Sequence, residues 1–225
     1  MEKRWARLAA PLPYETNELV LLIDLTHTFT DNMPVYPGDP CSRLYQSHFI
    51  KDSGFSDYRV ESNMHVGTHM DAPLHMVDGG AYICDIPLAH FKGKGHLVDA
   101  LGKNSISLDL LSGHLIGKGD IVLVWTDWSK KFHKADYFDG YPEIAEDFAR
   151  QLVTWGVSLL GLDTPSPDKD PFPIHKILLG KNVLIIENLT NLDALESFKQ
   201  DFEIHAYPVK RKADGAPVRV VAEIK

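Results

Sequence analysis

The chain has 225 residues, of which 44% are hydrophobic and 24% are charged, and its formal net charge is −8. These proportions are typical of a globular protein with a sizeable core, and the length favours a single domain over residues 1–225. The negative charge argues against nucleic acid or an anionic membrane surface as the main partner, but it suits a site in which carboxylates bind cations.

The first residues and the cysteines bear on the cellular compartment. Residues 1–13 carry several charges and lack the apolar core of a secretory signal, so we expect none there. Cys41 and Cys84 form no C-x-x-C motif, which argues against a disulfide framework or a thiolate zinc cluster. The sequence therefore predicts a reducing, cytoplasmic environment.

Three segments precede the most informative part of the chain. Leu19–Leu25 predicts a strand, and its apolar run predicts that this strand is buried. Met33–Pro40 contains three prolines and one glycine, which predict a stiff loop that is either a pocket wall or a plain surface turn. Asp57–Met64 alternates polar and apolar residues and predicts another strand.

The next eleven residues read HVGTHMDAPLH and place three histidines, His65, His69 and His75, around Asp71. The glycine, threonine and proline between them are poor residues for a helix interior, so a strand that ends in a turn is expected. Imidazole and carboxylate groups hold divalent cations while leaving coordination positions open, whereas closed structural zinc sites favour thiolates. The segment therefore predicts a metal site that performs chemistry.

The other histidines have no such company. Most isolated histidines of globular proteins are surface residues or hydrogen-bonded core residues, and this interpretation is given to His27, His48, His90, His96, His114, His133 and His205.

Strands and helices alternate through the second half of the chain. The strands are expected at Gly95–Leu101, Asp120–Thr126 and Val157–Leu162, and the second is apolar on both faces, as a central strand would be. Pro142–Gly156 has apolar residues at helical spacing between helix start and stop signals, which predicts an amphipathic helix. A second stiff polar loop follows at Gly161–Asp168.

Two further residues could join the histidine segment. Pro173–Leu179 predicts a short helix that carries His175, which on its own reads as an ordinary helix residue. Asn182–Ile186 predicts a strand whose end delivers Glu187, a carboxylate that is costly to bury unless it is paired or metal-bound; a salt bridge would also explain it. Finally, Glu203–Lys225 alternates around Ala213–Ala216, which predicts a hairpin. The elements together predict an α/β fold with a mixed central sheet.

Residues 65–75 match the pattern H-x-G-T-H-x-D-x-P-x-H at every fixed position. The chain thereby resembles the cyclase family of metal-dependent hydrolases, which includes bacterial-type kynurenine formamidases and isatin hydrolases. The resemblance continues in PVYPGD at 34–39, in GLDTPS at 161–166, and in His175 with IIENL at 185–189, so it covers most of the chain.

This resemblance implies a swivelling β/β/α fold and a homodimer or homotetramer. It implies that His65, His69 and Asp71 bind one divalent ion, and that Asp71 bridges to a second ion held by His175 and Glu187. Zinc is the expected metal and manganese the alternative, with one or two ions per chain.

The resemblance also implies the reaction. His75 would be the proton donor and acceptor rather than a ligand, and metal-activated water would cleave a C–N bond of a small, aromatic amide, as in N-formylkynurenine hydrolysis. Aromatic formamidases of this family usually carry tryptophan where this chain has Tyr36, a residue that would pack against the substrate ring. The tyrosine can still stack on an aromatic group.

Three alternatives remain open at this point. The substrate could be isatin, another cyclic amide or a lactone, because these hydrolases share the metal signature. The same ions could serve a cyclising or dehydrating lyase. A binding protein in which the ion staples the fold is the third, and the absence of cysteine ligands argues against it.

Overall fold

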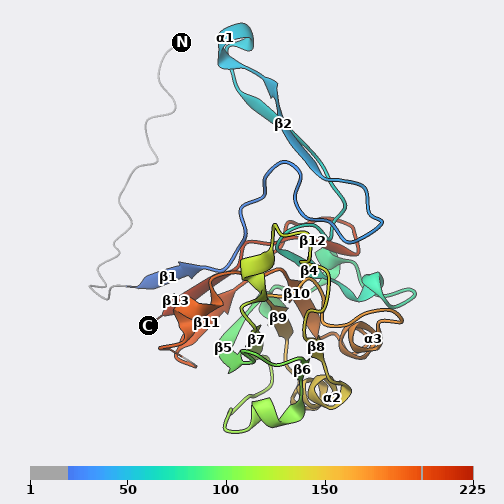
Figure 1. Ribbon diagram of the computed structural model, residues 1–225, viewed down its shortest axis with the longest axis vertical. Coiled ribbons are helices and arrows are strands. Elements are labelled where there is room, and N and C mark those ends of the chain that lie inside the picture. The colour runs from blue at the N-terminus through green and yellow to red at the C-terminus, as the bar shows by residue number, and fades with distance from the viewer. Residues whose placement is uncertain (1–19, 199, 225) are drawn as a thin grey trace, which may run out of the picture.

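The structure is a computed structural model that describes residues 20–198 and 200–224. Within them, nine strands form one curled mixed sheet in the order β1-β13-β11-β5-β7-β9-β10-β4-β12 (Figure 1). Neighbours from β5 to β10 run parallel, and the outer pairs run antiparallel. The strands are β1 Leu21–Asp24, β4 His69–Asp71, β5 Lys92–Asp99, β7 Ile121–Trp125, β9 Leu159–Leu162, β10 Leu184–Glu187, β11 Phe202–His205, β12 Gly215–Pro217 and β13 Val221–Ile224. The predicted α/β fold with a mixed central sheet is confirmed.

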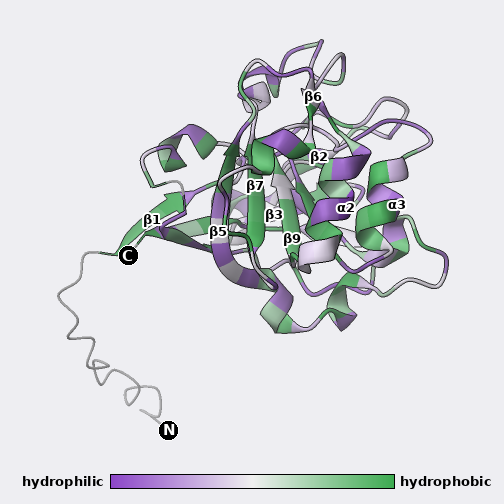
Figure 2. Ribbon diagram, turned by 90° about the horizontal axis from the view of Figure 1, so that it is seen from below, coloured by the Kyte–Doolittle hydropathy of each residue, from purple (hydrophilic) through white to green (hydrophobic). Residues whose placement is uncertain are grey.

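The middle of the sheet consists of strands that are apolar on both faces. All residues of β7 are buried, and β7 pairs in parallel with β5 on one side and β9 on the other. Figure 2 shows β7 as apolar along its length between these neighbours. The prediction of a central strand at Asp120–Thr126 is confirmed, because only a strand covered on both faces gains from a continuous apolar run.

Two helices cover one face of this sheet. Helix α2 spans Glu146–Trp155 and helix α3 spans Pro173–Leu179, the range predicted for it. Side chains of both helices join one apolar cluster with residues of β7, β9 and β10, including Phe148, Leu152 and Leu178. This packing fixes α3, and therefore His175, against β10.

Helix α2 begins later than predicted. It ends at Gly156, which has a φ of 70°, as the glycine stop signal indicates. At the other end, strand β8, Glu143–Ile144, pairs with β6, Ser105–Ile106, and the Ile144 amide donates to the Pro167 carbonyl. These backbone bonds are made with distant residues, so the local helix signal at Pro142 is overridden.

A hairpin extends away from the body of the molecule (Figure 1). It consists of β2, Arg43–His48, and β3, Asp57–Glu61, with the short helix α1, Ile50–Ser53, at its tip. All five residues of β3 are exposed, so the alternation in Asp57–Met64 marks a strand of a projecting hairpin and not a face of the core.

The predicted burial of the first strand is wrong. Strand β1 forms only at Leu21–Asp24, and Leu19 lies outside the described residues. The strand occupies an edge of the sheet and pairs with β13, and Leu22 is 60% exposed.

The predicted hairpin around Ala213–Ala216 at the C-terminal end is confirmed, because the Pro208–Val218 bridge and the bond from the Val209 amide to the Pro217 carbonyl continue its pairing toward the turn. Strands β11 and β13 do pair antiparallel with each other, and Val218, Val220 and Ala222 are buried as their alternation predicts. The segment Gly215–Pro217 in the connection of this hairpin forms β12, which also pairs with β4 at the far edge of the sheet. Asp214 is thereby carried to the histidine segment. No helix among the described residues has the length and apolar character needed to cross a membrane.

Candidate metal centre and its pocket

Strand register brings three of the predicted ligands together. His69 and Asp71 are two residues apart on β4 and so share one face of the sheet. Glu187 lies directly opposite His69 on the neighbouring strand β10. The His69 Nε2 atom is 3.4 Å from Asp71 Oδ1 and 3.3 Å from Glu187 Oε2. All three side chains are buried.

The other two predicted ligands approach from separate elements. His175 on α3 places Nε2 3.2 Å from Glu187 Oε1 and 3.7 Å from Asp71 Oδ2. His65, in the segment before β4, places Nδ1 2.8 Å from Asp71 Oδ1. The structure therefore brings all five predicted ligands into one cluster.

Each of these three histidines uses its second ring nitrogen on an acceptor outside the cluster. Such outer contacts fix the tautomer of a metal-binding histidine and direct its lone pair toward the ion. The contacts are His65 Nε2 to Asp214 Oδ2 at 2.9 Å, His69 Nδ1 to the Gly67 carbonyl at 2.8 Å, and His175 Nδ1 to Asp168 Oδ1 at 2.5 Å.

The inner atoms of the cluster fit a cation. The His69 Nε2 and Asp71 Oδ2 atoms are buried and have no hydrogen-bond partner within the described residues. Buried polar atoms without a partner are costly, and a divalent ion would satisfy both. Three imidazoles and two carboxylates are also a donor set that zinc and manganese accept.

The electrostatics of the cluster point the same way. Burial lowers the pKa of His65 and His69, but the nearby carboxylates of Asp214, Asp71 and Glu187 outweigh it and raise these pKa values to about 9 and about 10. Burial raises the pKa of Asp71 and Glu187, yet the surrounding imidazoles hold both pKa values below the ordinary value. The buried carboxylates of Asp71 and Glu187 are therefore stabilised by nearby positive charge, which protonated imidazoles or a metal ion can supply.

His75 lies beside the cluster, at the end of the short 3₁₀ helix Pro73–His75. Its ring stacks on that of His65 with 4.0 Å between centroids, and its Nδ1 is 3.3 Å from Asp214 Oδ2. Burial lowers its pKa below the ordinary value of 6.5, so it is neutral at pH 7 and able to accept a proton. One imidazole nitrogen of His75 also lies within 4.8 Å of ligand atoms of His65 and Asp71, so its assignment as a proton carrier stays a prediction.

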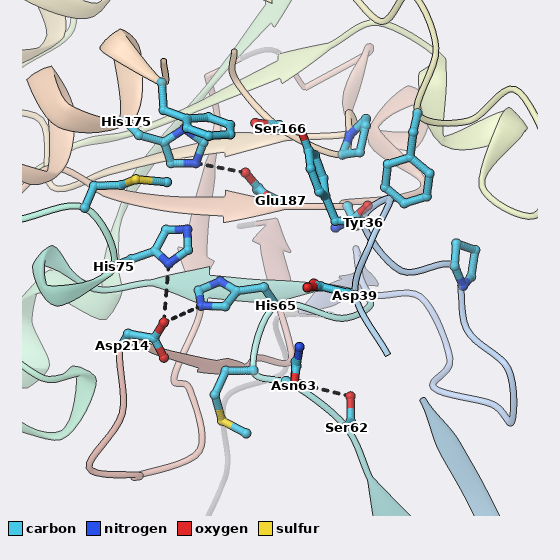
Figure 3. Close-up of a pocket in the computed structure, with 17 residues that line it drawn as sticks. Tyr36, Asp39, Ser62, Asn63, His65, His75, Ser166, His175, Glu187 and Asp214 are labelled. Atoms are coloured by element: carbon cyan, nitrogen blue, oxygen red, sulfur yellow. Dashed lines mark hydrogen bonds and ion pairs between the residues drawn. The ribbon is translucent and has the colours of Figure 1, made fainter. Parts of the chain in front are cut away.

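A pocket of about 550 Å³ opens onto this cluster. Figure 3 shows His75 between Asp214 on one side and His175 with Glu187 on the other. Tyr36 lines the pocket and packs edge-to-face with Phe138 at 5.9 Å between ring centroids, so the stiff proline loop is a pocket wall and not a plain turn. Phe172, Pro34, Pro165, Met64 and Met76 add apolar surface, and Asp39 and Ser166 add polar atoms.

A buried hydrogen-bond network supports the backbone around Gly67, which has a φ of 68°. The Asn188 side chain donates to the Gly67 carbonyl at 3.1 Å and accepts from the Tyr137 hydroxyl at 2.6 Å. Thr68 donates to the Asn188 carbonyl at 2.6 Å. The loop after β10 therefore holds the carbonyl on which His69 rests.

Sequence reasoning missed the three acceptors behind the histidines. Asp168 ends the second stiff loop, and its place seven residues before His175 is the sequence signal for this contact. Asp214 was interpreted as part of a turn, because Asp-Gly is a common turn pair. The Gly67 carbonyl carries no side-chain signal at all.

Comparison with known proteins places this geometry in a family. The family model described as "Putative cyclase" matches residues 23–169. The kynurenine formamidase of Bordetella avium is 30% identical over 209 residues, which cover 89% of this chain and 96% of that relative. Isatin hydrolase A from Labrenzia aggregata, solved with benzyl benzoate, superposes with a TM-score of 0.82 at 25% identity over 91% of this chain and 94% of that one.

A solved protein described as a potential metal-dependent hydrolase with cyclase activity is 30% identical, with a TM-score of 0.75, and the match covers 92% of this chain and 98% of that one. The family match spans more than half of the chain, and it includes the segment that carries four of the site residues. The chain belongs to the cyclase family.

Proposed function

We propose that this protein is a metal-dependent hydrolase that cleaves the C–N bond of a small aromatic amide. One observation carries the proposal: the five predicted ligand side chains converge beside a pocket with aromatic walls. Two of their buried atoms, His69 Nε2 and Asp71 Oδ2, have no hydrogen-bond partner within the described residues. The relatives named kynurenine formamidase and the neighbour named isatin hydrolase support it, because both names describe cleavage of an amide next to an aromatic ring.

The cation and His75 would have separate roles in the reaction. A bound divalent cation would lower the pKa of water toward neutrality and polarise the amide carbonyl oxygen. His75, neutral at pH 7, accepts a proton from the water that attacks the carbonyl carbon, and it then donates that proton to the leaving nitrogen. The products are a carboxylic acid and a free amine, so the reaction consumes one water.

The pocket suits a flat aromatic substrate. A volume of about 550 Å³ accommodates a one- or two-ring molecule. Tyr36, which is 38% exposed, and Phe138 form an edge-to-face pair on whose free surfaces a further ring can stack. The proposed substrates are N-formyl aromatic amines, with isatin-like cyclic amides and lactones as alternatives within the same reaction class.

We propose zinc as the bound metal, with manganese as the alternative. Five donors exceed what one ion with an open position needs, which supports the predicted pair of ions bridged by Asp71. His65 and His69 would then hold one ion, and His175 with Glu187 the other.

The test combines metal analysis of the purified protein with a screen of N-formyl aromatic amines, isatin and simple lactones. We expect at least one equivalent of zinc or manganese per chain and release of a free aromatic amine. The reaction in heavy-oxygen water separates hydrolysis from the lyase alternative, because only hydrolysis places solvent oxygen in the acid product. A product without that label would sink the hydrolase proposal.

We also propose the predicted self-assembly, in the form of a homodimer built around the projecting hairpin. The support is apolar exposure: Ile50, Phe55, Tyr58 and Val60 are each more than 50% exposed on this hairpin. Exposed apolar side chains gathered on one element are typical of protein interfaces.

Light scattering after size exclusion tests the assembly. The wild type is expected at twice its chain mass of 25.3 kDa, and a variant with Tyr58→Glu and Val60→Glu at the single mass. Leu115→Glu is the control, because Leu115 is 85% exposed on another part of the molecule. A monomeric wild type at micromolar concentration contradicts the proposal.

A further inference from the structure

We propose that Asp214 is a positioning residue that orients two imidazoles at once, His65 in the metal cluster and His75 in the pocket. This inference rests on the proposed function. Figure 3 shows the Asp214 carboxylate reaching both rings.

The backbone around Asp214 is fixed relative to the cluster. The Asp214 carbonyl accepts from the Ala72 amide at 2.8 Å, and Gly215, the next residue, lies opposite Asp71 in the β12–β4 pair. The backbone of Asp214 is therefore held at the edge of the sheet, next to the cluster.

One carboxylate oxygen serves both histidines. Asp214 Oδ2 is 2.9 Å from His65 Nε2 and 3.3 Å from His75 Nδ1. An ionised carboxylate only accepts hydrogen bonds, so His65 must present an Nε2–H group and His75 an Nδ1–H group. The lone pair of neutral His65 is then on Nδ1, the atom that faces Asp71, and the lone pair of neutral His75 is on Nε2.

The ring of His65 is closely packed between Gly215 and His75. A Cβ atom on residue 215 would lie 2.8 Å from His65 Cε1 and 2.8 Å from the Met70 carbonyl oxygen, so only glycine leaves room for the ring there. His65 and His75 are stacked with 29° between their planes. The two stacked rings thus contact the same carboxylate oxygen.

Asp214 differs in this respect from the other outer acceptors. Asp168 contacts the ring of one histidine, His175, and the Gly67 carbonyl that of one, His69. Asp214 is shared between a metal ligand and the proton carrier. Loss of its carboxylate is therefore expected to affect metal binding and turnover through separate contacts.

The experiment compares Asp214→Ala and Asp214→Asn with Asp78→Asn. Asp78 is exposed, lies three residues beyond His75, and loses the same charge when changed. The zinc dissociation constant is measured by competition with a chelating dye, without substrate. We expect it to rise about 10- to 100-fold in Asp214→Ala, less in Asp214→Asn, and not in Asp78→Asn.

Two further readouts separate positioning from a general structural role. At saturating zinc, kcat of Asp214→Ala is expected to stay at least tenfold below wild type, while KM changes little. Proton–nitrogen spectra of the zinc-loaded, ¹⁵N-labelled protein should show the Nδ1–H tautomer of His75 in the wild type and its loss in the variant. Asp214→Asn provides the same measurements if the alanine variant does not fold.

Three results would overturn the proposal: an unchanged zinc dissociation constant in Asp214→Ala, full recovery of kcat at saturating zinc, or an unchanged His75 tautomer. The zinc and tautomer measurements need no substrate. Failure of the proposed hydrolase function, with no amide cleaved by the wild type, is therefore distinguishable from failure of this inference.

Discussion

At the scale of single residues, the histidines of the site differ in what their second nitrogen touches. His69 rests on a backbone carbonyl and His175 on a buried carboxylate, which hold their other nitrogens inside the cluster. His65 and His75 share the half-exposed carboxylate of Asp214, but the other nitrogen of His65 contacts Asp71 inside the cluster, whereas the ring of His75 lies beside the cluster. The same side chain can thus be assigned to metal binding or to proton transfer by its surroundings.

This division predicts the outcome of His75→Ala. Turnover of the amide substrate should fall by about 10²- to 10⁴-fold, because general acid–base catalysis contributes on that order. Metal content and melting temperature should stay close to wild type, since the five predicted ligands remain. His133→Ala is the control, because His133 is exposed and outside the pocket. Loss of metal from His75→Ala would instead make His75 a ligand.

At the scale of elements, the loop after β10 and the segment before β4 support each other through buried hydrogen bonds. Tyr137 is fully buried and donates to Asn188, which in turn donates to the Gly67 carbonyl under His69. A chain of buried bonds of this kind is costly to interrupt, because the remaining atoms lose a partner without gaining water.

Tyr137→Phe is therefore expected to lower the free energy of unfolding by about 1–3 kcal/mol, because Asn188 Oδ1 loses its donor. Urea denaturation measures this change. Tyr45→Phe is the matched control: the Tyr45 hydroxyl bonds to Glu61 on the exposed hairpin, and its loss should cost less than about 0.5 kcal/mol. Equal effects of the two substitutions would refute the structural role of the network.

At the scale of the whole molecule, stability is linked to pH through a buried acid at the end of β9. Asp163 is fully buried and accepts hydrogen bonds from the Thr126 hydroxyl at 2.6 Å and from the Thr126 amide. Burial outweighs these bonds and raises the pKa of Asp163 from 3.8 to about 6. A raised carboxyl pKa favours the protonated native state, so this contribution is complete below pH 3.8 and is lost as pH rises through about 6.

Asp163→Asn should remove that dependence. Relative to the variant, the wild type is expected to lose about 2–3 kcal/mol of unfolding free energy between pH 4 and pH 7, since one pKa unit corresponds to about 1.4 kcal/mol. Urea denaturation at pH 4, 5, 6 and 7 in the presence of a chelator provides the comparison. Asp139→Asn, at an exposed position, is the control. Parallel stability curves for wild type and Asp163→Asn would contradict the prediction.

Metal binding is also expected to depend on pH. The raised pKa values of His65 and His69, about 9 and about 10, mean that both rings carry a second proton, and hence a positive charge, at pH 7 when the metal is absent. Each must lose that proton to bind an ion, and so must His175, whose pKa nearby carboxylates also raise, so the zinc dissociation constant should rise by up to about 1,000-fold per pH unit as pH falls from 8 to 6. Chelator competition at three pH values measures the slope, and a flat profile would show that these rings are not ligands.

The sequence by itself determined the chemistry of the site and the nature of the core strands. His69 and Asp71 share a face because strand residues alternate, and an unbroken apolar run such as Ile121–Trp125 has a stable place only at the middle of a sheet. Both inferences depend on neighbours in the chain, so periodicity and residue type were sufficient for them.

Only the tertiary structure decided what lies behind each histidine. Asp214 reaches His65 across 149 positions of sequence because β12, in the connection of the C-terminal hairpin, also pairs with β4. Helix α2 starts late because distant backbone groups compete for its first residues. Strand pairing between remote segments is set by the packing of the whole sheet, and no local pattern records it, which is why the five clustered side chains could be predicted and the carboxylates behind them could not.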